Sequence, residues 1–565
     1  MTALSSPPEA MPETPTVEID KALRRLDQGK KAWAELPPLK KAVLLQELMT
    51  DLYSVSEEWI ATSCRGKRIL RNSPEEGEEW IGGFMPIMRN ARLLYDALTH
   101  YGAPPIPNTY QRSDGQWVAQ VFPLDWKEKL MFMGFKAEVW IKPGHKPTQG
   151  SFYKNPEHDG RISLVLGAGN QGSIGPMDCL YKLFVEGEVC ILKLNPVNDY
   201  LGPYMIRAFR ALIEGNFITI VYGGSETGKY LCSHELVDNI HITGSDKTHD
   251  SIVWGAGAEG TANKEANTPV NTKKITSELG CVTPIVVIPG EWTDKEIDYQ
   301  AKQIASMVTH NASFNCNAGK AVLIHEGWAL KEKLKQSVEH HLNRKGARNA
   351  FYPGAAERYQ RFIRRYESHI ICGEKMTKKN RDVVPWTIID VPAQPDEYAL
   401  VTEAFCGILS WSELSAASTD EFTTKAVDFC NESLWGSLSA HLLIDPKTEK
   451  SKPDLLDQAI AKLEYGAIAV NCWSGVNYGL CTVPWGAFPK HTLQNIESGI
   501  GMVHNTLMLD HPQKGVVKAP FTIAPTPAWF FDNKNLIGLG KQLLRFEKSP
   551  SVLNFIRTVA NAARC

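Results

Sequence analysis

A cysteine and a glutamate lie in two short segments of small and polar residues, each next to an apolar stretch. Cys316 is part of HNASFNCNAGKAVLI, and Glu278 is part of ITSELGCVTP earlier in the chain. A thiol and a carboxylate in such loops are the minimum needed for covalent catalysis followed by general-base hydrolysis. A lone cysteine of this kind is more often inert, so a catalytic role also requires an oxyanion site and a hydride acceptor.

The segment between residues 162 and 245 predicts the framework for such a site. Four short strands, within ISLVLGAGNQG, EVCILKLNP, FITIVYGG and VDNIHITGS, alternate with three helical segments. This alternation is typical of βαβ units on a parallel sheet, which is a common nucleotide-binding architecture. The sequence therefore predicts an α/β fold.

Small or polar residues follow each of these strands: Asn170, Lys193, Gly223 and Gly244–Ser245. Ligands of open α/β sheets bind beyond the carboxyl ends of the strands, which favours a ligand site here. The stretch GAGNQG also fits G-x-G-x-x-G, but a lone match is a weak signal. A tight turn that binds nothing is the competing interpretation.

Several ordered motifs make the chain similar to the aldehyde dehydrogenase superfamily over about residues 20–510. The segments that carry the resemblance are NQGSIGPMDCLYKLFVEGEVCILKLNP, HITGS, SELG, NASFNCNAG, EAFCGILS, AVNCWSG and VPWGAFPKH. The resemblance implies that Cys316 is the nucleophile, that Glu278 activates water and that the Asn170 amide binds the oxyanion. It implies oxidation of an aldehyde through a thiohemiacetal and a thioester on the cysteine.

The implied cofactor is NAD or NADP. The predicted cofactor-binding residues are Lys193, Gly223, Gly228, Gly244, Ser245, Glu403 and Phe405. The family commonly has an acidic residue three positions after the lysine, where it holds the ribose hydroxyls and repels a 2′-phosphate. This chain has Pro196 there, so we expect NADP to be accepted at least as well as NAD.

The chain departs from the family pattern around its catalytic motifs. Ala168-Gly169 replaces a tryptophan-containing turn, Cys281 replaces a glycine, Ser313-Phe314 replaces Gly-Gln, and Ile408 replaces a proline. The resemblance therefore indicates a divergent member, whose substrate cannot be carried over from better-known relatives.

The resemblance implies a Rossmann-type cofactor domain and an α/β catalytic domain with a small oligomerisation arm. The predicted divisions are a disordered N-terminus (1–16), N-terminal helices with the cofactor domain (17–280), a catalytic domain (281–489), a closing segment or arm (490–510) and a C-terminal extension (511–565). The arm would also include about residues 136–158, and it implies a homodimer or homotetramer.

Composition excludes several other classes of protein. With 61 basic and 63 acidic residues the net charge is −2, which gives no reason to expect a nucleic-acid partner. The 12 cysteines form no CxxC pair and no cluster with histidines, so we expect a reducing compartment, no disulfide framework and no metal site. Neither a secretory signal nor a membrane-length apolar run is found, and the prediction is a soluble cytoplasmic protein.

The C-terminal extension combines apolar residues with basic ones between Lys541 and Cys565. A basic helix with an apolar face can lie on a membrane surface. Packing of the helix on the protein's own surface is the favoured interpretation.

Four functional hypotheses follow. The leading one is a hydrolytic, NAD(P)-dependent aldehyde dehydrogenase that produces a carboxylic acid. The second is a relative in which coenzyme A takes the acyl group, or which reduces an acyl thioester; Glu278 counts against it, since transfer to a thiol needs no water-activating base. The third is a non-catalytic protein that retains the fold. The fourth is a cysteine hydrolase without redox chemistry, which would need a histidine partner.

Overall fold

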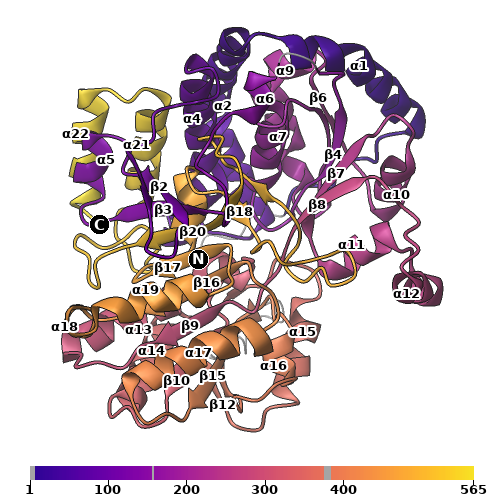
Figure 1. Cartoon of the computed structure of the whole chain (residues 1–565). Coiled ribbons are helices and arrows are strands. Elements are labelled where there is room, and N and C mark those ends of the chain that lie inside the picture. The colour runs from indigo at the N-terminus through magenta and orange to yellow at the C-terminus, as the bar shows by residue number, and fades with distance from the viewer. Residues whose placement is uncertain (1–6, 156–157, 374–382) are drawn as a thin grey trace.

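The computed structural model describes residues 7–155, 158–373 and 383–565, which fold around two sheets (Figure 1). The smaller sheet is parallel, with the strand order β6-β5-β4-β7-β8. Its strands are β4 (Ile162–Leu166), β5 (Val189–Lys193), β6 (Ile218–Val221), β7 (Asn239–Gly244) and β8 (Lys274–Leu279). The four strands predicted from the alternating segment are confirmed, and the sheet adds the strand that ends at the predicted base.

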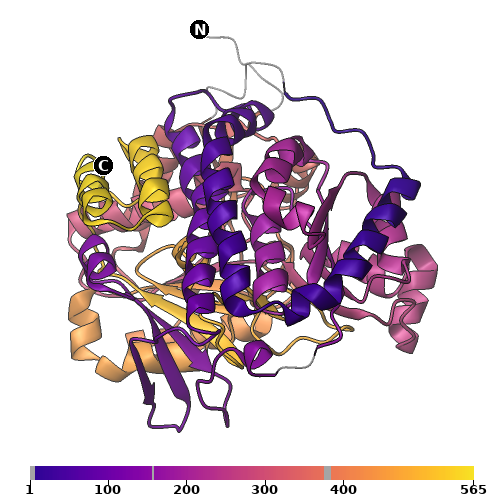
Figure 2. The ribbon, with the colours of Figure 1, turned by 90° about the horizontal axis from the view of Figure 1, so that it is seen from above.

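Helices cover the smaller sheet; of the long N-terminal helices, α1 packs directly on β4, β5 and β6, and α2 packs on α4, α8 and α9 (Figure 2). The prolines at 37 and 38 separate the first two helices, as the sequence predicts. The elements are α1 (Thr16–Glu35), α2 (Pro38–Gly66), α3 (Pro74–Glu78), η1 (Glu79–Phe84), α4 (Met85–Thr99), α7 (Ile174–Phe184), η2 (Asp199–Leu201), α8 (Gly202–Ala208), α9 (Arg210–Glu214), α10 (Ser225–Ser233), α11 (Asp246–Val253) and α12 (Gly257–Ala266).

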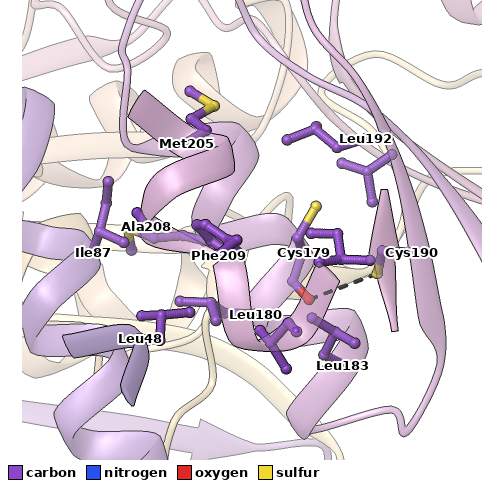
Figure 3. Close-up of a cluster of buried hydrophobic side chains, with 14 of the residues drawn as sticks. Leu48, Ile87, Cys179, Leu180, Leu183, Cys190, Leu192, Met205, Ala208 and Phe209 are labelled. Atoms are coloured by element: carbon purple, nitrogen blue, oxygen red, sulfur yellow. Dashed lines mark hydrogen bonds between the residues drawn. The ribbon is translucent and has the colours of Figure 1, made fainter. Parts of the chain in front are cut away.

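A buried cluster joins these helices to the sheet (Figure 3). Leu48 of α2 and Ile87 of α4 lie on one side of it, and Leu192 of β5 lies on the other. Strands buried on both faces read as continuous apolar runs, which is why the β5 segment VCILK contains no alternation. This core holds the strands in place, and with them the residues at the carboxyl edge of the sheet.

The larger sheet has eleven strands, in the order β1-β2-β3-β20-β17-β16-β9-β10-β15-β14-β12. The seven strands from β20 to β14 are parallel, and antiparallel strands complete both edges. The strands are β1 (Asn108–Gln111), β2 (Trp117–Phe122), β3 (Lys136–Ile141), β9 (Pro284–Val287), β10 (Ala321–His325), β12 (His369–Cys372), β14 (Trp386–Asp390), β15 (Ile408–Leu414), β16 (Ser439–Leu443), β17 (Ala467–Val470) and β20 (Pro512–Lys518).

Helices lie on both faces of the larger sheet. On β9, Val286 packs into the cluster that includes α17 and α19, whereas Ile285 and Val287 pack into the cluster that includes α13 and α14. This division follows from the alternation of side chains along a strand. The helices are α5 (Trp126–Met131), α6 (Ser151–Lys154), α13 (Asp294–Thr309), η3 (His310–Ser313), α14 (Lys331–Lys345), α15 (Ala355–Ile363), α16 (Tyr398–Val401), α17 (Thr419–Ser433), α18 (Pro446–Ser451), α19 (Pro453–Lys462) and α20 (Gly475–Leu480).

The two segments predicted to form an arm meet in part: the Gly150 N–H donates to the Met508 carbonyl at 2.8 Å, and Gln149 forms a β-bridge with Leu509. In the first, β3 is the third strand of the large sheet and pairs with β20. The second contains β19, which forms a small hairpin-like pair with β18. The two-stranded sheets are β18 (Trp485–Gly486) with β19 (Met502–Val503), and β11 (Arg348–Asn349) with β13 (Val383–Val384). The predicted disordered terminus falls partly outside the described residues, and α1 begins at its last position.

The C-terminal extension supplies β20 and two helices, α21 (Leu536–Lys548) and α22 (Val552–Ala562). Helix α21 packs on α4, α3 and η1, beside the N-terminal half of the chain (Figures 1 and 2). Helix α22 packs on α21 and leaves Val552, Leu553, Ile556 and Val559 exposed. Across the described ranges, no helix is both long and apolar enough to cross a membrane.

Candidate active site

The loop that carries Cys316 has an unusual backbone. After α13, the consecutive residues Asn311, Ala312 and Ser313 all have positive φ angles, of 51°, 56° and 68°. Non-glycine residues in this left-handed region are costly and persist only where surrounding contacts fix them. The loop therefore requires a rigid frame.

Buried polar contacts supply that frame. Lys67 Nζ donates to Asn311 Oδ1 at 2.9 Å and forms an ion pair with Glu79 at 2.7 Å. The backbone N–H of Asn311 donates to Glu78 at 3.0 Å, and Glu78 is itself paired with Arg348 at 2.6 Å. Charges this deeply buried need partners, and each has one here. The N-terminal helices therefore hold the cysteine loop in place.

Glu278 lies near the end of β8, with 3 % of its surface exposed. Burial raises its pKa to about 8, and the negative charge of Asp178 adds to this, while interactions with the Cys316 thiol and the Trp485 indole oppose it. Burial also raises the pKa of Cys316 well above its ordinary value, and the Glu278 carboxylate raises it further. The charge on each group therefore disfavours a charge on the other, and a single proton between them is favoured over two negative charges.

Asn170 follows β4 and contacts the same loop. Its side-chain Nδ2 donates to the Phe314 carbonyl at 2.9 Å, and its own carbonyl accepts from Asn311 Nδ2 at 3.0 Å. These bonds place the asparagine, which follows a strand of the smaller sheet, beside the cysteine loop. The structure thus brings together Cys316, Glu278 and Asn170, as the sequence predicts.

A cleft of about 1510 Å³ opens from this point along the carboxyl edge of the smaller sheet. Of the seven predicted cofactor-binding residues, six line it: Lys193, Gly228, Gly244, Ser245, Glu403 and Phe405. Gly223 does not; the adjacent Gly224 takes its place in the lining. A Cβ on Gly223 would come within 2.1 Å of Thr227 Oγ1, so this glycine is required for close packing inside the strand-to-helix turn.

The cleft has features suited to phosphates and a ribose. Cβ atoms added to Gly224 or Gly228 would meet nothing within 4 Å, so the backbone there borders open space. Ser245 is the N-cap of α11, and helix N-termini favour anions. Glu403 pairs with Lys320 at 3.1 Å. The donor set and the open glycine turns fit a dinucleotide.

A second, narrower cavity of about 160 Å³ reaches Cys316 from the opposite side. Most of its lining is apolar or aromatic, including Trp473, Trp485 and Tyr478. Within the described parts of the chain, the residues that line both cavities are Asn170, Ile174 and Cys316. The thiol and the amide therefore stand where an open polar cleft meets an apolar channel.

Comparison with known proteins identifies the family. Residues 179–489, more than half of the 565-residue chain, match the model of the aldehyde dehydrogenase family. The chain belongs to the aldehyde dehydrogenase family. A curated relative, D-glyceraldehyde dehydrogenase (NADP(+)) of Picrophilus torridus, is 26 % identical over 309 residues, which are 52 % of this chain and 56 % of that protein. The chain thus spans little more than half the length of this relative.

Solved structures of aldehyde dehydrogenases share the fold over most of the chain. γ-Glutamyl-γ-aminobutyraldehyde dehydrogenase from Burkholderia cenocepacia J2315 has a TM-score of 0.61 at 16 % identity, covering 89 % of both chains. NAD-dependent aldehyde dehydrogenase from Sinorhizobium meliloti has a TM-score of 0.57 at 17 % identity, covering 91 % of this chain and 89 % of that one. At these identities the likeness is one of fold.

Sequence reasoning missed several residues of this aldehyde dehydrogenase site. Lys320 directly follows the nucleophile motif, and its Nζ donates to the Asn315 carbonyl at 2.9 Å while pairing with Glu403. Its position directly after Gly319, at the end of the nucleophile motif, was a signal in the sequence that it belongs to the site. Lys67 and Glu79 gave none, because they act from helices more than 200 positions away from the cysteine loop.

Proposed function

We propose that this protein is an NAD(P)-dependent aldehyde dehydrogenase that oxidises an aldehyde to a carboxylic acid. The observation that carries the proposal is the shared lining: Cys316 and Asn170 belong to both the large cleft and the apolar channel. A dinucleotide and an aldehyde can therefore reach one thiol from opposite sides. This arrangement, together with the family match, favours oxidation over the other hypotheses.

The cleft residues would hold the cofactor. Gly224, Gly244 and Ser245 would contact its phosphates, and Lys193 would contact the adenosine ribose. Names of relatives support either dinucleotide, since the Picrophilus protein is described with NADP(+) and the Sinorhizobium structure as NAD-dependent. When bound, the nicotinamide supplies the hydride acceptor that a thiohemiacetal needs to become a thioester.

The first step takes place at Cys316. The thiol loses its proton to solvent, and the sulfur then forms a bond to the aldehyde carbon. The carbonyl oxygen becomes an anion next to Asn170. That amide has two N–H donors, of which one bonds to Phe314, so the other is available for the anion. One such donor contributes roughly 3–4 kcal/mol to transition-state stabilisation in comparable sites.

Glu278 then acts on water. Its carboxylate accepts a proton from water, the resulting hydroxide attacks the thioester carbon, and the C–S bond breaks to release the acid and the Cys316 thiolate. A carboxyl that lines the same cleft as the nucleophile supports hydrolysis over transfer to coenzyme A. The raised pKa of about 8 also suits a base that must both bind and release a proton near neutral pH.

We also propose an assembly and a location for the enzyme. A cavity of about 810 Å³ is lined by residues of both predicted arm segments, 136–158 and 490–510, and a second subunit of a homodimer or homotetramer would fill it. All 12 cysteines are free, which supports a reducing, cytoplasmic location. Sedimentation velocity at several concentrations would test the assembly.

The proposed activity is tested by reduction of NAD and NADP with a panel of aldehydes, with and without coenzyme A. We expect aldehyde-dependent formation of reduced cofactor and of the free acid, at a rate that coenzyme A does not raise. Formation of acyl-coenzyme A would contradict the hydrolytic route. Absence of cofactor reduction with every aldehyde would contradict the proposal as a whole.

A further inference from the structure

The C-terminal extension contributes to the wall of the apolar channel, although it lies beyond the family match. We infer that residues 528–547 determine substrate choice, and that they restrict it to aldehydes with an uncharged, apolar tail of about the size of a benzene ring. This inference rests on the proposed function, because it assumes that the aldehyde enters through the channel.

Four residues of the extension line the channel: Ala528, Trp529, Leu543 and Glu547. Across from them lie Ile81 and Met85, from the helical segment η1 to α4, and Phe132 and Phe135, from the region between α5 and β3. Trp529 also packs edge-on against Phe135, with ring centroids 6.4 Å apart. The extension and the N-terminal half of the chain thus form the channel together.

Close packing holds α21 in this position. A Cβ on Gly540 would come within 2.6 Å of the Trp80 Cβ, and a Cβ on Gly77 would come within 2.6 Å of the Leu536 side chain. Only glycine allows the helix to approach α3 and η1 so closely. The wall is therefore a fixed part of the fold.

Buried ion pairs anchor the same helix. Glu547 accepts from Arg89 at 2.7 Å through Oε1 and from Arg92 at 2.7 Å through Oε2. The remaining Arg89 donors bond to Glu128 at 2.8 Å and to the Leu480 carbonyl at 2.9 Å. Each Arg89 nitrogen thus donates to a protein group, and both charges at the channel are paired with protein charges.

No charge at the channel is therefore free to pair with a charged group on the substrate tail. Among the described lining residues, Arg89 and Glu547 are the only side chains of the lysine, arginine, aspartate and glutamate types. His310 also lines the channel, and burial lowers its pKa, so it is neutral at physiological pH. A carboxylate or ammonium on the substrate would lose its hydration without gaining a partner.

The channel volume sets the size of the tail. At about 160 Å³ it is close to the roughly 150 Å³ of an engineered apolar cavity that binds benzene in another protein. An aromatic ring or a chain of about six carbons would fill such a space. Larger tails require displacement of Trp529 or its neighbours.

Two opposite substitutions test the inference. Trp529→Ala enlarges the channel, and Ala528→Leu narrows it. Trp126→Ala is the matched control, because Trp126 is 53 % exposed on α5 and does not line the channel. For each protein, kcat/KM is measured with butanal, hexanal, decanal, benzaldehyde, 4-phenylbenzaldehyde and succinic semialdehyde, with circular dichroism and Tm as checks of folding.

We expect the wild type and Trp126→Ala to prefer hexanal and benzaldehyde, and to use succinic semialdehyde at least about tenfold less well than butanal. Trp529→Ala should raise the ratio of 4-phenylbenzaldehyde to benzaldehyde by about tenfold or more, and Ala528→Leu should lower kcat/KM for benzaldehyde by a similar factor. If Trp529→Ala does not fold, the change in kcat/KM of Ala528→Leu alone tests the inference.

Unchanged ratios in the folded variants, or a preference for the charged semialdehyde, would overturn the inference while leaving the proposed function intact. If the wild type oxidises no aldehyde, the proposed function fails and the inference fails with it.

Discussion

The two cavities that meet at Cys316 are built from the chain in different ways. The cleft is formed mainly by the ends of consecutive strands and the turns that follow them, from Gly167 to Gly280. The channel takes its walls from six separate regions, around residues 81–89, 132–135, 170–174, 310–317, 473–485 and 528–547. Repeated local units thus build the cleft, whereas segments distant in the sequence build the channel.

The cysteine between the two cavities gives the largest expected effect. Cys316→Ala should abolish oxidation, with a loss of at least about a thousandfold in kcat, because no other thiol lies at the junction. Binding of the cofactor, measured by fluorescence titration, should not change. Cys281→Ala is the matched control: Cys281 is fully buried, its Sγ contacts the Ser439 carbonyl, and it lines neither cavity.

Turnover by Cys316→Ala above a few per cent of wild type would show that the nucleophile is another group. Loss of activity in a folded Cys281→Ala variant would show that a thiol outside the junction is also required.

Substitution of Asn170 tests whether the junction also stabilises the negative charge that forms on the substrate oxygen. Asn170→Ala should lower kcat by about 10²–10³-fold while KM for the aldehyde changes little, because the amide acts on an anion formed only during the reaction. Steady-state kinetics with one aldehyde measure both quantities. A rise in KM with unchanged kcat would instead indicate that Asn170 only shapes the cavity.

Much of the cofactor side could be predicted from the sequence, for a physical reason. Asn170, Lys193 and Ser245 each follow a β-branched strand, and the carboxyl ends of parallel strands must lie at one edge. Gly223 was assigned one position too early, since the strand end is visible in the sequence but the direction of the turn after it is not. The left-handed loop at Asn311 has no signal of this kind.

The channel side could not be predicted, because it depends on contacts across the whole chain. Arg89 and Glu547 are 458 positions apart, yet they form a buried pair at 2.7 Å. The basic and apolar residues of the tail were compatible with a membrane surface, and packing on the protein's own surface was the favoured interpretation. They gave no indication that Trp529 or Leu543 would line a cavity that reaches Cys316.

The buried ion pairs of Glu547 on the channel side can be tested through their effect on the stability of the protein. Glu547→Gln removes one of the two carboxylates that pair with each arginine, so that Arg89 keeps only Glu128 and Arg92 keeps only Asp96. We expect it to lower the free energy of unfolding by about 3–5 kcal/mol. Glu18→Gln is the matched control; Glu18 pairs with Lys21, both are more than half exposed, and the expected loss is below about 1 kcal/mol. Urea denaturation measures both, and equal losses would contradict the anchoring role.

The stability that the Glu547 ion pairs contribute also depends on pH. Burial raises the pKa of Glu547, but Arg92 and Arg89 outweigh it, so the pKa lies below its usual value. The carboxylate therefore contributes stability above the pKa of the unfolded chain, and this contribution is lost as pH falls through the folded pKa. The difference in stability between wild type and Glu547→Gln should shrink in acid.

The smallest expected effect concerns cofactor choice. Pro196 is exposed and follows Asn195, which lines the cleft. We expect kcat/KM with NADP to be at least equal to that with NAD, and Pro196→Asp to shift the ratio toward NAD by about tenfold, or ~1.4 kcal/mol. A wild-type preference for NAD above tenfold would show that another acidic group, such as Glu226 in the cleft, contacts the ribose.

The central claim is that the oxidised substrate is held as a thioester on Cys316 until Glu278 activates water. Because the Glu278 pKa is about 8, the carboxylate form increases as pH rises toward that value, and thioester hydrolysis should accelerate with it. Glu278→Gln cannot take up the proton at any pH, so the thioester should persist in this variant.

The most direct test mixes Glu278→Gln with an aldehyde and NAD(P), stops the reaction with acid and determines the mass of the peptide that contains Cys316. The account predicts one burst of reduced cofactor per active site and an acyl group on Cys316, which wild type shows only transiently. Loss of the burst together with turnover, or an acyl group on another residue, would contradict it.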